Sequence, residues 1–198
     1  MSETVGVSEV RRSRRMEVRR AQILDAAAEV FIEAGYEAAT LDAIGERVGL
    51  SKPSLYYYVR SKEDLLAQIL LDLLESVGER VDAAAAQDPA ERLRVLARVH
   101  VEILCTRPGG RLIGRHADIR EQATKLANTG GRYRGTITGI IAEGIVAGAF
   151  RPVDLEIFGW TFMLALNSVA SWWTPEHPRS PYEIADEITG YFLEGVTL

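Results

Sequence analysis

The sequence is poor in the residues that carry most enzyme and metal chemistry. It has one cysteine, Cys105, and three histidines, His100, His116 and His177, among 198 residues. A single cysteine excludes an intramolecular disulfide and fits a reducing cytoplasm, where we expect the protein to act. The histidines lack H-x-x-x-H spacing, and neither G-x-S-x-G nor a phosphate-binding loop occurs. We therefore expect no metal site, no cofactor and no catalytic residues, which argues against an enzyme.

Long apolar runs are also missing. No stretch approaches the roughly 18 uncharged apolar residues of a membrane span, and the N-terminus lacks the apolar run of a secretory signal. Strand-like alternation persists nowhere, whereas apolar residues recur at helical spacing through most of the chain. We therefore expect an all-α protein of about nine helices that does not bind membranes.

Charge is distributed unevenly. The net charge is −5, which by itself argues against a general nucleic-acid binder. Residues 1–62 nevertheless hold 10 lysines and arginines against 9 acidic residues, while residues 63–198 hold 13 against 19. Six arginines lie within residues 11–20. This distribution predicts that the basic N-terminal end binds DNA while the acidic remainder stays away from it.

Residues 40–65 follow the pattern of two short helices and the start of a third. Thr40 is placed to cap the first helix, and Gly49 is suited to end it because glycine adopts the left-handed conformation readily. Ser51 and Ser61 are placed to cap the next two helices. Two short helices joined by a glycine-containing turn form a helix-turn-helix, whose second helix enters the DNA major groove.

The same stretch resembles the signature of the TetR family of bacterial transcriptional regulators in the run T-L-x-x-I-x-x-x-V-G-x-S-K-x-x-L-Y-Y-Y-V-x-S-K-E-D-L. The resemblance covers about residues 17–66. Three positions depart from the family pattern: Gly45 replaces a common alanine, Tyr58-Val59 a frequent His-Phe pair, and Pro53 a frequent glycine. Pro53 and Tyr58 should change which bases are read.

Hydrophobic patterns divide the chain into three parts. We expect residues 1–16 to form a disordered basic arm, residues 17–66 the helix-turn-helix domain, and residues 67–198 a ligand-sensing and dimerisation domain. A long amphipathic pattern at residues 62–86 places the boundary inside a helix rather than in a flexible linker.

The expected DNA contacts centre on the second helix of the motif, predicted to span Lys52–Val59 and to lie in the major groove. Lys52 and Ser54 are placed for base edges or phosphates, and Lys62 for a phosphate beside the groove. The arginines before the motif either lie on phosphates, reach into a minor groove, or form a solvated charged run. The candidate DNA contacts are Arg14, Arg15, Thr40, Ser51, Lys52, Pro53, Ser54, Tyr56, Tyr57, Tyr58 and Lys62.

The stretch 154–173 is apolar nearly all round, which favours burial on two sides. A helix-turn-helix protein usually pairs to read two half-sites, so this segment and residues 182–193 are the natural homodimer surface. The TetR resemblance implies the same, through the last two helices. The candidate interface residues are Phe158, Leu166, Val169, Trp173, Ile184, Ile188 and Phe192.

Glycines weaken the helical pattern of the middle region. We expect residues 107–110 to form a turn and residues 111–121 a short helix. Gly131, Gly135 and Gly139 recur at four-residue steps, which would allow either close helix approach or space for a ligand.

The resemblance also implies a small-molecule pocket in the second domain. The candidate lining residues are His100, Cys105, Arg115, Tyr133, Phe162, Met163 and Trp172. Each has an alternative role, as a core histidine, a buried thiol, a solvated arginine, or a core or interface residue.

The C-terminal half, in AEGIVAGAFRPVD and SVASWWTPEHPRSPYEIADEITGYFLEGV, is similar to actinobacterial TetR regulators of lipid and steroid breakdown, some of which bind acyl-CoA thioesters. That similarity implies a small hydrophobic ligand or an acyl-CoA, whose phosphates would need cations such as Arg111, Arg115, Arg120 or Arg132, unless these are solvated surface arginines. We therefore expect a homodimeric transcriptional repressor that binds double-stranded DNA and is released from it by such an effector. A DNA-binding regulator without an effector is the alternative.

Overall fold

The computed structural model describes residues 3–84, 88–127 and 132–197, which form ten helices and no strand. The helices are α1 (Glu3–Ala34), α2 (Leu41–Arg47), α3 (Lys52–Tyr56), α4 (Lys62–Ala83), α5 (Pro89–Thr106), α6 (Pro108–Arg115), α7 (Ala117–Leu126), α8 (Arg132–Val146), α9 (Leu155–Trp172) and α10 (Pro181–Glu194). The all-α prediction is confirmed. There is one helix more than the expected nine because the region after residue 107 forms two helices. Within the described ranges, none of the helices has the length and apolar character needed to span a membrane.

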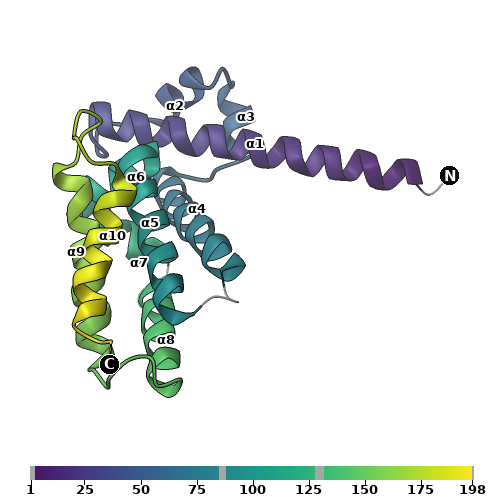
Figure 1. Ribbon diagram of the computed structural model, residues 1–198. Coiled ribbons are helices and arrows are strands. Elements are labelled where there is room, and N and C mark those ends of the chain that lie inside the picture. The colour runs from purple at the N-terminus through teal and green to yellow at the C-terminus, as the bar shows by residue number, and fades with distance from the viewer. Residues whose placement is uncertain (1–2, 85–87, 128–131, 198) are drawn as a thin grey trace.

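Helix α1 differs from its prediction at its N-terminal end. It begins at Glu3, so the expected disordered arm of residues 1–16 is helical from that residue onward. Arginine and glutamate are good helix formers, so a helix anchored by its apolar second half can continue through a charged segment that buries little. The first half of α1 extends beyond the other helices in Figure 1.

Local capping shapes the helix-turn-helix. The Thr40 hydroxyl accepts from the amide of Ala43 at 3.2 Å, and Ser61 caps α4 in the same way through Asp64. Gly49 has φ +65°, the left-handed conformation predicted for it. Ser51 occupies the N-cap position of α3 but makes no side-chain capping bond; its hydroxyl lies 2.9 Å from that of Ser54.

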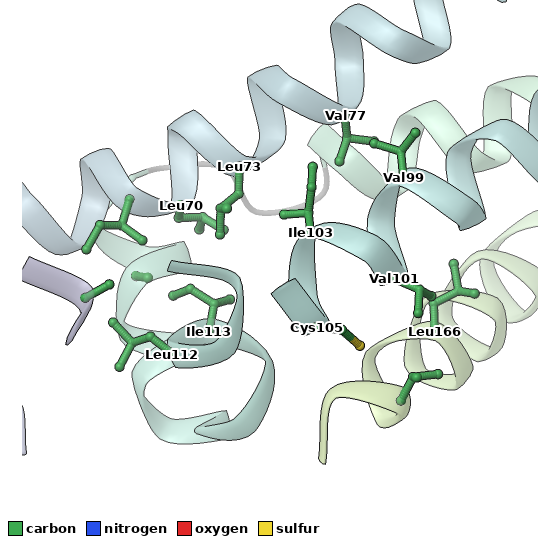
Figure 2. Close-up of a cluster of buried hydrophobic side chains, with 14 of the residues drawn as sticks. Leu70, Leu73, Val77, Val99, Val101, Ile103, Cys105, Leu112, Ile113 and Leu166 are labelled. Carbon is green, nitrogen blue, oxygen red and sulfur yellow. The ribbon is translucent and has the colours of Figure 1, made fainter. Parts of the chain in front are cut away.

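One hydrophobic core runs through both predicted domains, and α4 contributes to it along its whole length. Leu65 and Leu66 near the start of α4 are fully buried beside α1, whereas Leu73 and Val77 pack against α5 and α6. Figure 2 shows the latter group together with side chains from α9. The proposed boundary inside α4 thus falls within a continuous helix, one end of which lies in each half of the protein.

The close approach of α5 and α6 occurs where the sequence predicts a turn. Helix α6 begins at Pro108, and a Cβ atom added at Gly110 would overlap the carbonyl oxygen of Ile103. Gly135 and Gly139, by contrast, have no neighbouring atom within 4 Å of such a Cβ, and neither lines the cavity among α4 to α9. The prediction of close helix approach at these two residues is therefore wrong, and ligand space beside them remains a prediction. Gly131 lies outside the described residues.

A Gly110→Ala substitution should destabilise the protein by about 2–3 kcal/mol, because the added methyl group meets backbone rather than a movable side chain. Gly139→Ala, its matched control, meets no atom and should stabilise α8 by up to about 1 kcal/mol through helix propensity. Urea unfolding followed by circular dichroism measures both. Equal stability of the two variants would contradict the close packing of α5 on α6.

Candidate DNA interface and ligand cavity

The face expected to contact DNA is built on α3 and the residues that follow it. Leu55 and Val59 point into the core and are almost fully buried, which fixes the opposite face of the motif toward solvent. Tyr57 is 69% exposed there, and its ring meets that of half-buried Tyr58 edge-on. Helix α3 itself ends at Tyr56, three residues earlier than predicted. The exposed members of the predicted set are Arg14, Arg15, Thr40, Ser51, Lys52, Pro53, Ser54, Tyr56 and Tyr57.

Lys52 has an acidic neighbour on α2. Its ammonium lies 3.1 Å from the carboxylate of Asp42, and this hydrogen bond raises the pKa of Lys52. Both side chains are more than half exposed, so the pair adds little stability. The Lys52 ammonium is charged, and a DNA phosphate could replace Asp42 as its ion-pair partner.

Lys62 is less free than its sequence position suggests. Its ammonium donates to the carbonyl oxygens of Tyr36 at 2.8 Å and Glu37 at 2.9 Å, and it lies 5.0 Å from the centroid of the Tyr36 ring. The sequence analysis assigned Lys62 to a phosphate and did not foresee these contacts within the protein. Lys62 holds the loop after α1 against the start of α4, so its role toward phosphate remains only a prediction.

The arginines of α1 also fall into two groups, those bonded within the protein and those exposed to solvent. Arg19 donates to the carbonyl of Val48 at 2.7 Å, and Arg20 donates to Gln68 of α4 at 3.0 Å. These two side chains join α1 to the end of α2 and to α4. Arg14 and Arg15 are exposed and remain candidates for phosphates.

A cavity of about 630 Å³ lies among α4, α5, α6, α7, α8 and α9. Its wall is mostly apolar, and α4 contributes four side chains to it: Leu70, Leu73, Leu74 and Val77. Three of the predicted ligand-binding residues line it: His100, Tyr133 and Met163. The sequence interpretation missed Asn167, Trp160 and Arg134, which also line it. Asn167 was detectable as a lone amide within the most apolar stretch of the chain.

The other four predicted ligand-binding residues lie outside this cavity. Arg115 donates to the carbonyl oxygens of Ala170 at 3.0 Å and Trp173 at 3.3 Å, near the C-terminal end of α9. Cys105 is buried, and burial raises the pKa of its thiol to about 11. Phe162 is fully buried among aromatic rings, while Trp172 is nearly half exposed on the outer face of α9.

Three polar side chains of the cavity wall form a hydrogen-bonded chain. Nε2 of His100 lies 3.1 Å from Oδ1 of Asn167, and Nδ1 lies 2.9 Å from the hydroxyl of Tyr133. Burial lowers the pKa of His100 to about 4, against the opposing effect of the Asn167 hydrogen bond. Burial also raises the pKa of Tyr133. All three side chains are therefore neutral at pH 7.

Charged groups also line the cavity, of which Lys125 and Glu121 are exposed and Arg120 and Arg134 are half-buried. The Arg134 guanidinium sits 4.2 Å from the centroid of the Trp160 ring. Arg120, one of the four arginines suggested for phosphates, also donates to the carbonyl of Ile113 at the end of α6. The side chain of Arg132, another of these four arginines, lies outside the described part of the structure.

The predicted dimer residues are mostly inside the subunit. Leu166 and Val169 are fully buried, and Phe158, Trp173 and Ile184 nearly so, whereas Ile188 and Phe192 are half-buried. A side chain already buried within its own subunit has no surface left to cover, so the prediction named the inner face of these helices. The exposed face of α9 carries Ile157, Thr161, Leu164, Ser168 and Trp172, and Tyr191 of α10 is exposed as well.

Within the described residues, no group of three or more histidine, cysteine or acidic side chains is placed to hold a metal ion.

The all-α architecture with an exposed helix-turn-helix defines a DNA-binding regulator. Residues 23–69 match the family model described as bacterial regulatory proteins, tetR family, and residues 86–196 match the tetracyclin repressor-like C-terminal domain. The second match covers more than half of the chain, and the protein belongs to the TetR family.

Individual relatives agree with this assignment. The HTH-type transcriptional repressor KstR2 of Mycolicibacterium smegmatis is 26% identical over 195 residues, covering 90% of this chain and 91% of that protein. The structure of PfmR, a TetR family regulator from Thermus thermophilus, is 29% identical with a TM-score of 0.71, covering 87% of this chain and 97% of that one. AibR in complex with isovaleryl coenzyme A and operator DNA shares the fold, with 24% identity, a TM-score of 0.70 and the same coverage.

The buried imidazole should make stability depend on pH. Because the pKa of His100 is lowered from 6.5 to about 4, the unfolded chain takes up a proton below pH 6.5 that the folded chain refuses. Stability is therefore lost as pH falls from 6.5 toward 4. Between pH 7.5 and 5.0, the wild type should lose about 2 kcal/mol more than a His100→Gln variant.

Urea unfolding at the two pH values measures this difference, and the variant cancels the contribution of every other titrating group. If wild type and variant lost the same free energy, His100 would not be neutral in the folded protein.

Proposed function

We propose that this protein is a transcriptional repressor that binds a palindromic operator as a homodimer and is released by a small hydrophobic effector, an acyl-CoA thioester. The observation that carries the proposal is the position of α4. It supplies four apolar side chains to the cavity wall, and its first turns pack within the DNA-binding half. A ligand in the cavity therefore contacts the helix that supports the recognition motif.

Exposed groups on α3 and α1 support the DNA-binding part. Lys52 and Ser54 stand at the start of a short exposed helix, with Tyr57 just beyond its end, an arrangement suited to base edges and adjacent phosphates. Arg14 and Arg15 add exposed positive charge on α1. The cations of this half that are tied to carbonyl groups, such as Arg19 and Lys62, hold the motif in shape.

The exposed apolar face of α9 supports pairing. Ile157 is 64% exposed and Leu164 is 54% exposed, one above the other on the same side of the helix, and Tyr191 of the neighbouring α10 is 63% exposed. The two helices lie side by side at one edge of the molecule in Figure 1. A large apolar face of this kind, left open to solvent, marks an interaction site, and two copies joined here would present two recognition helices.

The chemistry of the cavity supports an acyl-CoA. An apolar wall suits an acyl chain, and three cations that line the same cavity suit phosphates. AibR, which shares this fold, was solved with isovaleryl coenzyme A and operator DNA. The cavity favours a sensor over the alternative, a regulator without an effector, because a DNA-binding dimer has no use for an open apolar space beside α4.

Fluorescence anisotropy with labelled DNA from upstream of the protein's own gene tests the proposal. We expect tight binding by the wild type and its loss on adding octanoyl-CoA. Lys52→Ala should weaken binding about tenfold and reduce the salt dependence by about one ion, because one phosphate contact is lost. Arg80→Ala, which also removes a cation from an exposed ion pair but lies far along α4, is the control and should bind as the wild type does.

An unchanged affinity and salt slope for Lys52→Ala would refute the placement of α3 on DNA. Tight DNA binding that no acyl-CoA alters would favour the regulator without an effector.

A charged substitution on the exposed face of α9 tests whether two subunits pair there. Ile157→Glu should give a monomer, because a buried carboxylate without a partner opposes association. Val146→Glu is the matched control, since Val146 is 90% exposed and lies at the end of α8, not on α9 or α10. Size-exclusion chromatography with light scattering measures the mass of each. A dimeric Ile157→Glu protein would place the interface elsewhere.

A further inference from the structure

The chain Tyr133–His100–Asn167 is an unusual feature of an otherwise apolar wall. Its members come from α8, α5 and α9, and all three line the cavity. His100 stands between the other two, with both ring nitrogens engaged and 9% of its surface exposed. Buried polar groups are costly unless they are hydrogen-bonded, and a partly satisfied set is available to a ligand.

The donors and acceptors of the three side chains show which of them are still free to bind a ligand. A neutral imidazole has one N–H, which Nε2 donates to Oδ1 of Asn167, so Nδ1 accepts the proton of the Tyr133 hydroxyl. His100 then has no further capacity. Asn167 has two N–H donors on Nδ2, and neither finds a protein acceptor in the described part of the chain. The polar group of this wall that is left for a ligand is thus the oriented amide N–H of Asn167.

The three side chains of this hydrogen-bonded chain carry no charge themselves. His100 is neutral at pH 7 because its ring is buried, and Arg120 nearby opposes its protonation further. An amide N–H directed by a neutral imidazole matches a neutral acceptor such as a carbonyl oxygen. A carboxylate would need the guanidinium of Arg120, which already donates to the carbonyl oxygens of Ile113 and Gly114.

We infer that Nδ2 of Asn167, oriented by His100 and Tyr133, donates a hydrogen bond to the thioester carbonyl of an acyl-CoA effector. This inference rests on the proposed function and adds the residue that tells a thioester from other apolar chains. The same wall offers the apolar side chains of Leu70, Leu73 and Val77 for the acyl chain, and the cations Arg120, Lys125 and Arg134 for the phosphates. The thioester carbonyl is the polar group directly attached to the acyl chain; the two amides and the hydroxyl of the pantetheine arm follow it toward the phosphates.

Matched probes that differ only in the carbonyl test this inference. They are S-octanoyl-N-acetylcysteamine against its thioether S-octyl-N-acetylcysteamine, and octanoyl-CoA against S-octyl-CoA. Isothermal titration calorimetry on the full-length protein without DNA gives their affinities. The wild type should bind each thioester about tenfold more tightly than its thioether, as expected for one hydrogen bond in a desolvated site.

Variants then assign the preference to the three side chains. In Asn167→Leu, which removes the donor at similar volume, the ratio should fall to about twofold or less. Tyr133→Phe keeps the ring but releases His100 and should lower the ratio partly, which also covers the case of an unstable Asn167→Leu protein. Met163→Leu is the control on the same wall and should change both affinities alike, leaving the ratio at its wild-type value.

Two outcomes would refute the inference in distinguishable ways. Equal binding of thioester and thioether by the wild type, or an unchanged ratio in both Asn167→Leu and Tyr133→Phe, would overturn the role of Asn167 and leave the acyl-CoA sensor standing. Binding of no probe by a protein that still binds operator DNA would overturn the acyl-thioester effector, and this inference with it.

Discussion

Helix α4 is the constraint on which the rest of the structure depends, because one rigid element is buried at both ends. Its first turns are held by α1 and its later turns form the cavity wall. Arg107 ties the junction of α5 and α6 to the middle of α4, through Asp72 at 2.5 Å and Ser76 at 2.9 Å. Burial beside this pair raises the pKa of Asp25 on α1, so charged groups from both halves meet where α4 passes between them. Any shift of α4 therefore reaches the recognition motif.

Neutral polar groups distinguish this cavity from the core around it. Five apolar side chains labelled in Figure 2 line the cavity and offer a ligand no directional contact: Leu70, Leu73, Val77, Ile103 and Ile113. On the same wall, Tyr133, His100 and Asn167 place one oriented donor in apolar surroundings. A hydrogen bond in such apolar surroundings is stronger than one at the surface, since the local dielectric constant is lower. Selectivity for a ligand thus needs few polar groups in the cavity wall, provided that hydrogen bonds among them hold each in place.

Most residues whose role depends on their immediate neighbours in the chain were predicted correctly; Ser51, which makes no side-chain capping bond, is an exception. Thr40, Gly49 and Ser61 act within one helical turn of themselves, and all three behave as expected. Residues whose role depends on a distant segment were not. Lys62 was expected to be available to phosphate, but the carbonyls of Tyr36 and Glu37 hold it, and no local pattern could reveal a partner 26 residues away.

The sequence by itself determined the all-α class, the helix-turn-helix and the TetR resemblance, because helical periodicity, capping and glycine placement are local properties of the chain. Tertiary structure decided which side of each apolar helix faces inward. Helix α9 is apolar nearly all round, so its pattern could not separate Leu166, which is in the core, from Leu164, which is on the surface. The cavity and its polar wall were decided in the same way, since His100, Tyr133 and Asn167 meet only once three helices have packed.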